Sequence, residues 1–189
     1  MRHKLKIVVN APAVTGFAAL MFIATLSGVL TGGKSTRLLF QTWHSSLLSP
    51  LTWLRFFTHV LGHTGWSHFM GNAAYILLLG PMMEEKYGSA ALVKVIVITA
   101  LITGAVNYLF FPGVALCGAS GVVFAFIILT SFTGFGAGEI PLTFLLIAAI
   151  FIGQQLYEGA FIRDDVSQLS HIIGGAVGAV IGYAWNRRG

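Results

Sequence analysis

The sequence predicts an all-α, polytopic membrane protein built as a bundle of six transmembrane helices. Of its 189 residues, 56% are hydrophobic and only 9% are charged, and the mean hydropathy is +0.84. These values lie far outside the composition of water-soluble proteins. Uncharged blocks of about 17 to 25 residues, the length that crosses a bilayer, recur along the chain. Residues 1–189 are expected to form a single domain, because six packed spans use nearly the whole length.

The first span is predicted at residues 11–30. The chain before it carries Arg2, Lys4 and Lys6, a basic cluster that is also typical of a secretory signal peptide. The uncharged block that follows is longer than a signal core, and no good small-x-small cleavage site comes after it. We therefore expect a retained transmembrane helix.

The segment between the first two spans, residues 31–65, is too polar to cross a bilayer but is rich in aromatic residues. Aromatic rings favour the interface between membrane and water. We expect a long interfacial loop that serves as a structural lid or wedge.

Five further spans follow, separated by charged or helix-breaking turns. Glu84-Glu85-Lys86 divides the second from the third, and this turn is expected to be a solvated cytoplasmic loop. Because the membrane sets the length of each block, the boundaries follow from the apolar stretches, of which 89–111 contains one charged residue, Lys94. The expected spans are 66–83, 89–111, 114–135, 140–157 and 166–186.

The basic residues predict the orientation of the spans. The N-terminal cluster, Lys86, Lys94 and two arginines near the C-terminus fall on one side of the membrane by this topology. The positive-inside rule makes that side cytoplasmic, so both termini are expected in the cytoplasm. Spans two, four and six then begin near the outer face. The net charge of +5 comes from scattered residues and does not indicate a nucleic-acid partner.

Four polar side chains are predicted near the outer ends of spans two, four and six. His68 and Asn72 are four residues apart and therefore share one face of the second helix. Ser120 is expected six residues into the fourth span, about 9 Å deep at about 1.5 Å per residue. His171 lies near the start of the sixth span. Polar groups inside a membrane are costly and mark function, so their shared depth favours a common site.

A glycine stripe is expected to bring His171 close to a neighbouring helix. Gly174, Gly178 and Gly182 lie on the same helical face as His171. Small residues let transmembrane backbones approach closely. The sixth helix is therefore predicted to pack tightly enough for its imidazole to reach a partner.

The four side chains permit nucleophilic catalysis. His171 can accept the Ser120 proton as a general base, and Ser120 can then attack an acyl carbon. His68, Asn72 and the backbone N–H groups around Ser120 and Gly118 can hold the developing oxyanion. Every carboxylate lies in a predicted loop or at the end of a span. The sequence therefore predicts a Ser-His dyad without a third, acidic member.

Single motifs among these residues are ambiguous. A serine flanked by glycines is, taken alone, more often a packing residue than a nucleophile. His59, His63 and His68 could suggest a metal site, but their spacing puts His68 on another face and no acidic or cysteine ligand is near. Cys117 has no cationic neighbour in the sequence that would favour its thiolate, so Ser120 is the better nucleophile. Neither a metal nor a cofactor is expected.

Three motifs follow one another in the chain: His68-x3-Asn72, the run Gly118-Ala119-Ser120-Gly121, and the pattern His-x2-Gly-x3-Gly that begins at His171. In this order they resemble the rhomboid family of intramembrane serine proteases, over about residues 53–183. The resemblance implies the minimal six-helix bacterial form, in a bacterial inner membrane, with its active site open to the outer face. It also implies the dyad and oxyanion roles given above.

Two positions depart from the family pattern. Arg55 and Thr58 resemble the Arg-x-x-Thr of the family's first loop, but Leu54 stands where the family usually has a tryptophan directly before the arginine. Phe124 stands one turn after the serine, where bacterial relatives often have a tyrosine that stacks on the base. We expect the Phe124 ring to stack on His171 in the same way.

The sequence thus predicts an endopeptidase that cuts transmembrane or membrane-proximal segments of single-span and other membrane proteins, with membrane lipid around it. Two other functions stay open. One is a catalytically silent protein of the same fold that binds membrane clients. The less favoured one is a small channel or transporter, which would need polar residues to continue toward the cytoplasm, where spans two, four and six are apolar.

Overall fold

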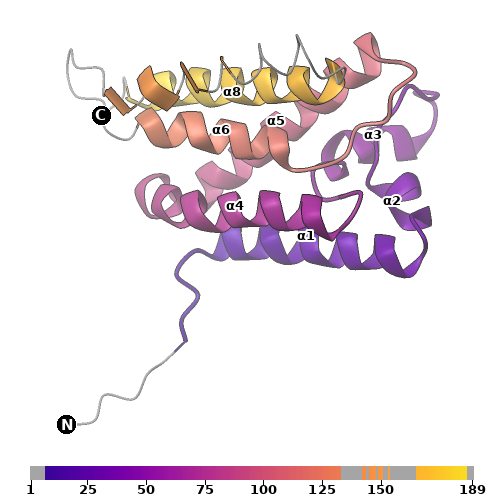
Figure 1. Ribbon diagram of the computed structural model, residues 1–189, viewed down its shortest axis with the longest axis horizontal. Helices are drawn as coiled ribbons and strands as arrows, with labels where there is room; N and C mark the ends of the chain where they lie inside the picture. The colour runs from indigo at the N-terminus through magenta and orange to yellow at the C-terminus, as the bar shows by residue number, and fades with distance from the viewer. Residues whose placement is uncertain are drawn as a thin grey trace.

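The computed structural model describes residues 7–132 and 165–186, together with some helical residues between 142 and 153. In this part of the chain every regular element is a helix, and the β-type pairing is limited to one antiparallel bridge between Thr42 and Leu116. Figure 1 shows the long helices packed side by side in one bundle. The prediction of an all-α protein is confirmed for these residues.

The first helix, α1 (Pro12–Leu30), occupies the predicted first span. Proline suits the start of a helix because its missing N–H would have no intrahelical partner there. The amides of Ala13 and Val14 donate to the two carboxylate oxygens of Glu84, at 2.8 and 2.9 Å. Glu84 belongs to the last turn of α4 (Trp66–Tyr87), so a side chain 70 positions downstream caps the start of α1.

The prediction of a solvated turn at Glu84 is wrong. Helix α4 continues beyond Met83, the predicted end of the second span, to Tyr87, and it stops at Gly88, whose φ is +82°. Glu84 is only 5% exposed. Besides the two amides of α1, Ser89 Oγ donates to it at 2.5 Å. A buried carboxylate is tolerated when donors surround it, and these donors come from segments whose position the sequence does not reveal.

Residues 31–65, predicted as one long loop, contain two short helices, α2 (Lys34–Leu39) and α3 (Pro50–Thr58). Helix α2 folds back closely onto the end of α1. A Cβ atom on Gly28 would overlap Thr36 Oγ1, so only glycine allows this approach. The segment is therefore a packed, partly helical part of the protein rather than an extended connection.

Arg55, in α3, is held inside this segment. Its side chain is 7% exposed, its Nε donates to Leu38 O at 2.9 Å, and its guanidinium lies 3.9 Å from the ring centroid of Trp43. The aromatic partner of the arginine is therefore Trp43. Leu54, at the position where the family usually has tryptophan, does not prevent the arginine from finding an aromatic face.

Helix α5 (Ser89–Phe110) matches the third predicted span, but α6 (Ser120–Ser131) does not match the fourth, which was expected to begin at residue 114. The residues before Ser120 are tied to the 31–65 segment, because Thr42 and Leu116 exchange two backbone hydrogen bonds of 2.9 and 2.8 Å. Gly118 then has a φ of +127°, which no helix allows. Ser120 is thus the first residue of its helix, and the predicted helix start at residue 114 is wrong.

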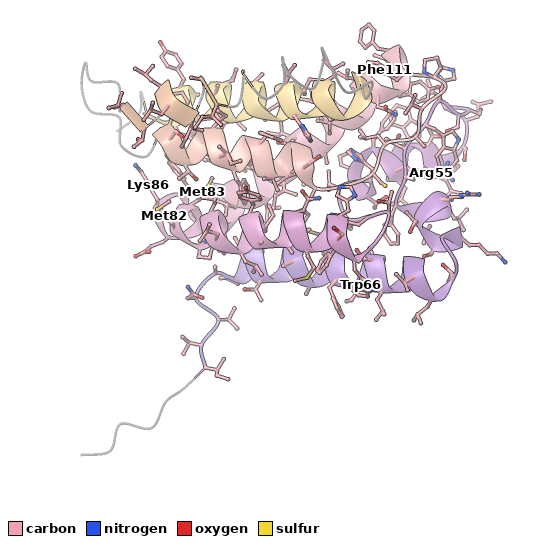
Figure 2. All side chains as sticks on the ribbon, viewed as in Figure 1. Arg55, Trp66, Met82, Met83, Lys86 and Phe111 are labelled. Carbon is pink, nitrogen blue, oxygen red and sulfur yellow. The ribbon has the colours of Figure 1, made fainter. Side chains whose placement is uncertain are left out.

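The last described helix, α8 (Asp165–Asn186), agrees with the sixth predicted span. Most of the fifth predicted span, 140–157, lies outside the described residues, although Leu145 and Ile150 within it are helical. Helices α4, α6 and α8 run in one direction and α1 and α5 in the other, so the first three begin at the same end of the bundle (Figure 1). Figure 2 shows Arg55 and Trp66 at that end and Lys86 at the opposite one.

The glycine stripe of α8 packs against α6. A Cβ atom on Gly174 would overlap the backbone of Gly121, and one on Gly178 would overlap the backbone of Ala125. The two helices therefore touch backbone to backbone, as close contacts between small residues allow. The predicted tight packing of this helix is confirmed, and its partner is the helix that begins with Ser120.

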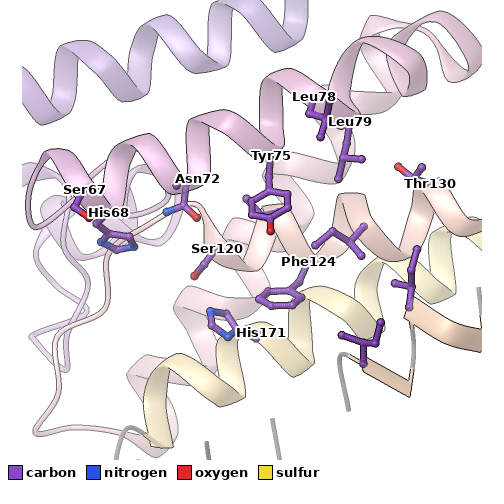
Figure 3. A pocket seen from close by; sticks show the side chains of 15 residues that line it. Ser67, His68, Asn72, Tyr75, Leu78, Leu79, Ser120, Phe124, Thr130 and His171 are labelled. Carbon is purple, nitrogen blue, oxygen red and sulfur yellow. The ribbon is translucent and has the colours of Figure 1, made fainter. Parts of the chain in front are cut away.

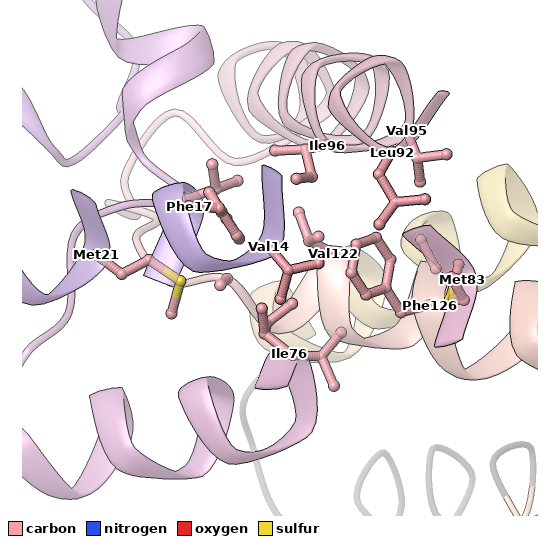
Figure 4. Packing of buried hydrophobic residues seen from close by; sticks show 14 of the residues in the cluster. Val14, Phe17, Met21, Ile76, Met83, Leu92, Val95, Ile96, Val122 and Phe126 are labelled. Carbon is pink, nitrogen blue, oxygen red and sulfur yellow. The ribbon is translucent and has the colours of Figure 1, made fainter. Parts of the chain in front are cut away.

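The hydrophobic core joins α1, α4, α5 and α6 (Figure 4). Met21, Ile76, Leu92 and Phe126, one from each helix, are fully buried in it. By length and composition, α1 and α5 are the two described helices that pass as candidate membrane spans. The other expected spans remain predictions. The core fixes the relative positions of α4 and α6, and so of the polar residues that they carry.

Candidate active site

A pocket of about 690 Å³ lies between α4, α6 and α8 (Figure 3). Its lining includes Ser120, His171, His68 and Asn72, the four residues that the sequence singles out. Three helices that are far apart in the chain therefore bring these side chains to one cavity. Most of the remaining lining is apolar and comes from α4, α6 and the fifth predicted span, including Leu78, Leu79, Val123, Ile127, Ile147 and Ile150.

Ser120 enters the pocket from the first position of α6. The segment before it is fixed by the amide of Gly118, which donates to His59 O at 2.9 Å. The Gly118 N–H is thus engaged with the protein, although the sequence had suggested it as an oxyanion donor. The amide of Ser120 itself lies in the first turn of the helix, where N–H groups have no intrahelical acceptor.

Gly118 also sets the distance between the two helices at the site. A Cβ atom built on it would lie 2.7 Å from His68 Cε1 and 2.8 Å from His68 Nε2, and 3.8 Å from Asn72 Nδ2. Any side chain would collide with the imidazole, and the positive φ of Gly118 is unfavourable for other residues as well. Glycine is therefore required here so that His68 and Asn72 can lie directly against the segment that leads to Ser120.

His68 is oriented by its neighbour Thr64. The Thr64 hydroxyl lies 3.3 Å from His68 Nδ1. When the hydroxyl donates to Nδ1, the neutral ring carries its proton on Nε2, the nitrogen next to Gly118. In this tautomer His68 presents an N–H donor on the side of Gly118.

Asn72 is 7% exposed, and its Nδ2 has no hydrogen-bond partner among the described residues. Buried amide groups are nearly always paired in folded proteins, because an unpaired donor costs free energy. An unpaired Nδ2 beside Gly118, in a residue that lines the pocket, is what a site reserved for an external acceptor requires.

His171 lies one helical turn before Gly174, where α8 is closest to α6. Its ring packs on Phe124, with centroids 4.4 Å apart and planes inclined by 38°. Figure 3 shows Ser120 and the imidazole facing the same space, with Phe124 beside the imidazole. The expected contact between Phe124 and His171 is confirmed, as a tilted stack, and it holds the ring toward the serine.

Comparison with known proteins places this fold and pocket in a family. The family model for the rhomboid domain matches residues 50–188, which include all four polar residues of the pocket. The chain belongs to the rhomboid family. This rhomboid is therefore an integral membrane protein, as its composition predicts.

Curated relatives of this rhomboid are named rhomboid protease GlpG. Those of Salmonella paratyphi A, Salmonella typhi and Salmonella newport are each 29% identical to it over 116 residues. The aligned region covers 61% of this chain and 42% of each relative. The chain thus matches less than half the length of these relatives.

Sequence reasoning missed several residues of the rhomboid pocket. Ser67 and Tyr75 line it, and Thr64 contacts His68. Tyr75 could have been found, because it lies three residues after Asn72 on the same helical face. Thr64 precedes the helix, so no periodicity points to it.

The rings of His63 and His68 meet edge to face, with centroids 4.9 Å apart. Among the described residues, no group of three or more His, Cys, Asp or Glu side chains forms a possible metal site. Within the described part of the chain, the two imidazoles have no third ligand of this kind to complete a zinc site.

Proposed function

We propose that this rhomboid is an intramembrane serine endopeptidase with a Ser120–His171 dyad. The observation that carries the proposal is the shared pocket, in which a serine and a histidine from different helices face one space beside two possible donor side chains. The names of the curated relatives, which are rhomboid proteases, support the same reaction.

In the proposed reaction, Ser120 Oγ attacks the carbonyl carbon of a substrate peptide bond while His171 accepts the hydroxyl proton. The tetrahedral intermediate then collapses, and His171 gives the proton to the departing amine. A water molecule, deprotonated by His171, attacks the acyl-enzyme and releases the second product. No carboxylate is needed in this scheme, because packing on Phe124 orients the imidazole.

The negative charge that develops on the substrate oxygen needs donors. The proposal assigns Asn72 Nδ2, His68 Nε2 and the amide of Ser120 to this task. Donors fixed in advance at the oxyanion position are a major source of catalysis in acyl transfer. The amide of Ser120 also lies at the positive end of the α6 dipole, which favours a negative charge at the same point.

The pocket supports a membrane-embedded substrate. From Ser120 it continues along apolar residues of α4 and α6 and reaches Ile147 and Ile150 of the fifth predicted span. An apolar segment of a membrane protein fits this lining. The segment has to leave its helical conformation, because a helix occupies its own carbonyl groups, so we expect small or helix-breaking residues near the cleavage site.

The proposal includes the arrangement in the membrane. It assigns six spans in one domain over residues 1–189, both termini in the cytoplasm of a bacterial inner membrane, and a pocket open to the outer face. The fifth span and the 31–65 segment are assigned to the substrate gate. The common starting end of α4, α6 and α8 supports one depth for the site residues (Figure 1).

The decisive test compares two serine variants of α6 in liposomes with a single-span substrate. Ser120→Ala is expected to lower cleavage by about 10⁴-fold or more and to abolish labelling by a fluorophosphonate. Ser131→Ala is the control, because Ser131 does not line the pocket and its buried hydroxyl donates to the backbone carbonyl of Ile127 in the same helix. Undiminished cleavage by Ser120→Ala would refute the dyad. Absent cleavage and labelling in the unmodified protein would favour the client-binding function instead.

A further inference from the structure

A second pocket, of about 440 Å³, lies where α1 ends and α2 begins. Its polar lining comes from Thr36, Arg37, Gln41, His63 and Thr64. Neither Ser120 nor His171 contributes to it, so it is a separate cavity. The wall near Gly32 and Gly33 is open, since a Cβ atom on either glycine would meet no atom within 4 Å.

His63 lines this second pocket and carries a buried acceptor nitrogen. Its side chain is 3% exposed, and its Nδ1 lies 3.1 Å from Leu61 O. A carbonyl only accepts, so the neutral ring keeps its proton on Nδ1 and leaves a lone pair on Nε2. Burial, assisted by the nearby His68, lowers the pKa of His63 to about 4, which keeps the ring neutral at physiological pH.

The Nε2 atom of His63 is buried and has no hydrogen-bond partner among the described residues. Thr25, the other polar neighbour, lies near Nδ1 at 3.3 Å and donates its own hydroxyl to Met21 O. Buried polar atoms are rarely left unpaired. His63 Nε2 can therefore accept a hydrogen bond from a hydroxyl or another donor outside the chain.

Arg37 contributes a positive charge to the same pocket. The sequence contains no aspartate or glutamate before Glu84. Glu84 lies in the last turn of α4, a helix of 22 residues. Such a helix is about 33 Å long, so Glu84 is remote from the end of α4 that adjoins the pocket. Residues 1–83 thus hold no carboxylate that could neutralise Arg37, and its positive charge can attract an anion to this pocket.

The position of the pocket indicates which anion reaches it. Helix α1 has 19 residues. Its length of about 28 Å is close to the hydrocarbon thickness of a bilayer, about 30 Å. If the helix crosses the membrane, its C-terminal end, where the pocket lies, meets the level of the lipid headgroups. Phosphate is then the most abundant anion at this depth.

We propose that this second pocket binds the headgroup of an anionic glycerophospholipid that carries a free hydroxyl, such as phosphatidylglycerol. The phosphate accepts hydrogen bonds from the Arg37 guanidinium, a pairing whose geometry suits both groups. The headgroup hydroxyl donates to His63 Nε2. Since the His63 ring contacts His68, a bound lipid lies one side chain away from the candidate active site.

The first experiment tests the phosphate contact. Binding of phosphatidylglycerol and phosphatidylcholine to the protein in detergent is measured by native mass spectrometry, for Arg37→Ala and Lys34→Ala. Both residues are exposed cations of α2, but only Arg37 lines the pocket. Arg37→Ala is expected to weaken phosphatidylglycerol binding about tenfold, the effect of losing one charge-assisted contact, and Lys34→Ala less than twofold. Equal effects of the two variants would overturn the site.

The second experiment tests the hydroxyl. Phosphatidylmethanol has the phosphate but lacks the hydroxyl, so the unmodified protein is expected to bind it several-fold more weakly than phosphatidylglycerol. His63→Phe keeps an aromatic ring of similar size and should bind both lipids alike. Equal binding by the unmodified protein would overturn the role of His63, even if His63→Phe does not fold.

A third arm separates a lipid from a soluble ligand. Glycerol 3-phosphate at millimolar concentration should leave phosphatidylglycerol bound, and displacement would identify a soluble phosphate ester as the occupant and overturn the lipid. All measurements are repeated in Ser120→Ala. Lipid binding should be unchanged there, so failure of the lipid site and failure of the proposed protease function give different results.

Discussion

At the residue scale, Asn72 and Gly118 are best explained by the positions of polar groups in the pocket, not by a contribution to stability. Gly118 leaves room for the imidazole of His68, and Asn72 keeps a buried nitrogen without a partner among the described residues. Neither residue stabilises the fold through a side-chain donor here: Gly118 has no side chain, and the unpaired donor of Asn72 costs free energy. Both choices fit the proposed oxyanion site, at which a negative charge would arrive only with a substrate.

Replacement of Asn72 by alanine separates these two effects. We expect Asn72→Ala to lower the cleavage rate by about 10²- to 10³-fold, the loss seen when one oxyanion donor is removed. The thermal midpoint should hardly fall, because Nδ2 has no hydrogen bond to lose among the described residues. Asn107→Ala is the contrast: its amide donates to Thr42 O and Val114 O, so that variant should lower the midpoint. An unchanged rate in Asn72→Ala would show a packing role only.

At the element scale, the contact between α6 and α8 determines where His171 lies. The backbones touch at Gly174 and Gly178, so any added atom pushes the imidazole away from α6. Interiors packed this tightly do not absorb even one methyl group without strain. The geometry of the proposed dyad therefore depends on Gly174 and Gly178, which do not line the pocket.

Two glycine-to-alanine variants test this dependence. Gly178→Ala is expected to cost about 1–3 kcal/mol of stability, because its Cβ would overlap the backbone of Ala125, and to reduce cleavage. Gly16→Ala, in α1, meets no atom within 4 Å and should be neutral or slightly stabilising, since alanine favours helix. Thermal unfolding in detergent measures both. Similar midpoints for the two variants would contradict a tight α6–α8 contact.

The cap on α1 allows a second test at this scale. Glu84→Gln removes the charge that binds the amides of Ala13 and Val14, and we expect a loss of about 1–3 kcal/mol. Glu85 is exposed next to it, so Glu85→Gln should change stability by no more than about 0.5 kcal/mol. Denaturant or thermal unfolding gives both values. The cap is refuted if the two variants lose the same amount.

At the scale of the whole molecule, two buried histidines of the 31–65 segment make stability depend on pH. Burial lowers the pKa of His59 to about 4, against a weaker opposite effect of its hydrogen bond with Ala100 O, and burial chiefly lowers that of His63 to about 4. Between pH 4 and 6.5 the unfolded chain therefore binds more protons than the folded one. The stabilisation that comes from these two neutral histidines is fully present above pH 6.5, and it is lost as the pH falls toward 4.

The expected slope is on the order of 1.4 kcal/mol per pH unit for each histidine within this window. Thermal midpoints measured from about pH 7 to about pH 4.5 should fall, and His59→Gln should fall less steeply than the unmodified protein. A midpoint that stays constant over this range would show that the two rings are not buried as neutral groups.

Across the molecule, the sequence predicted well those features that depend on composition and on the spacing of nearby residues. The apolar blocks located α1, α5 and α8, and the three-residue and four-residue spacings put the glycine stripe on one face of α8. The start of α6 could not be predicted, because it depends on the pairing of Leu116 with Thr42, a contact between distant segments. The donors around Glu84 and the contact of Thr64 with His68 are likewise tertiary. The roles of Ser120 and His171 stay predictions until cleavage is measured.

The cap by Glu84 also has a consequence in time. The first amides of α1 bind the carboxylate of Glu84, which the ribosome adds 70 positions later. At about 5–20 residues per second, this delay is on the order of 4 to 14 seconds. During that interval the amides of Ala13 and Val14 lack this acceptor. The hydrogen bonds between the start of α1 and Glu84 can thus form only after translation has passed the end of α4.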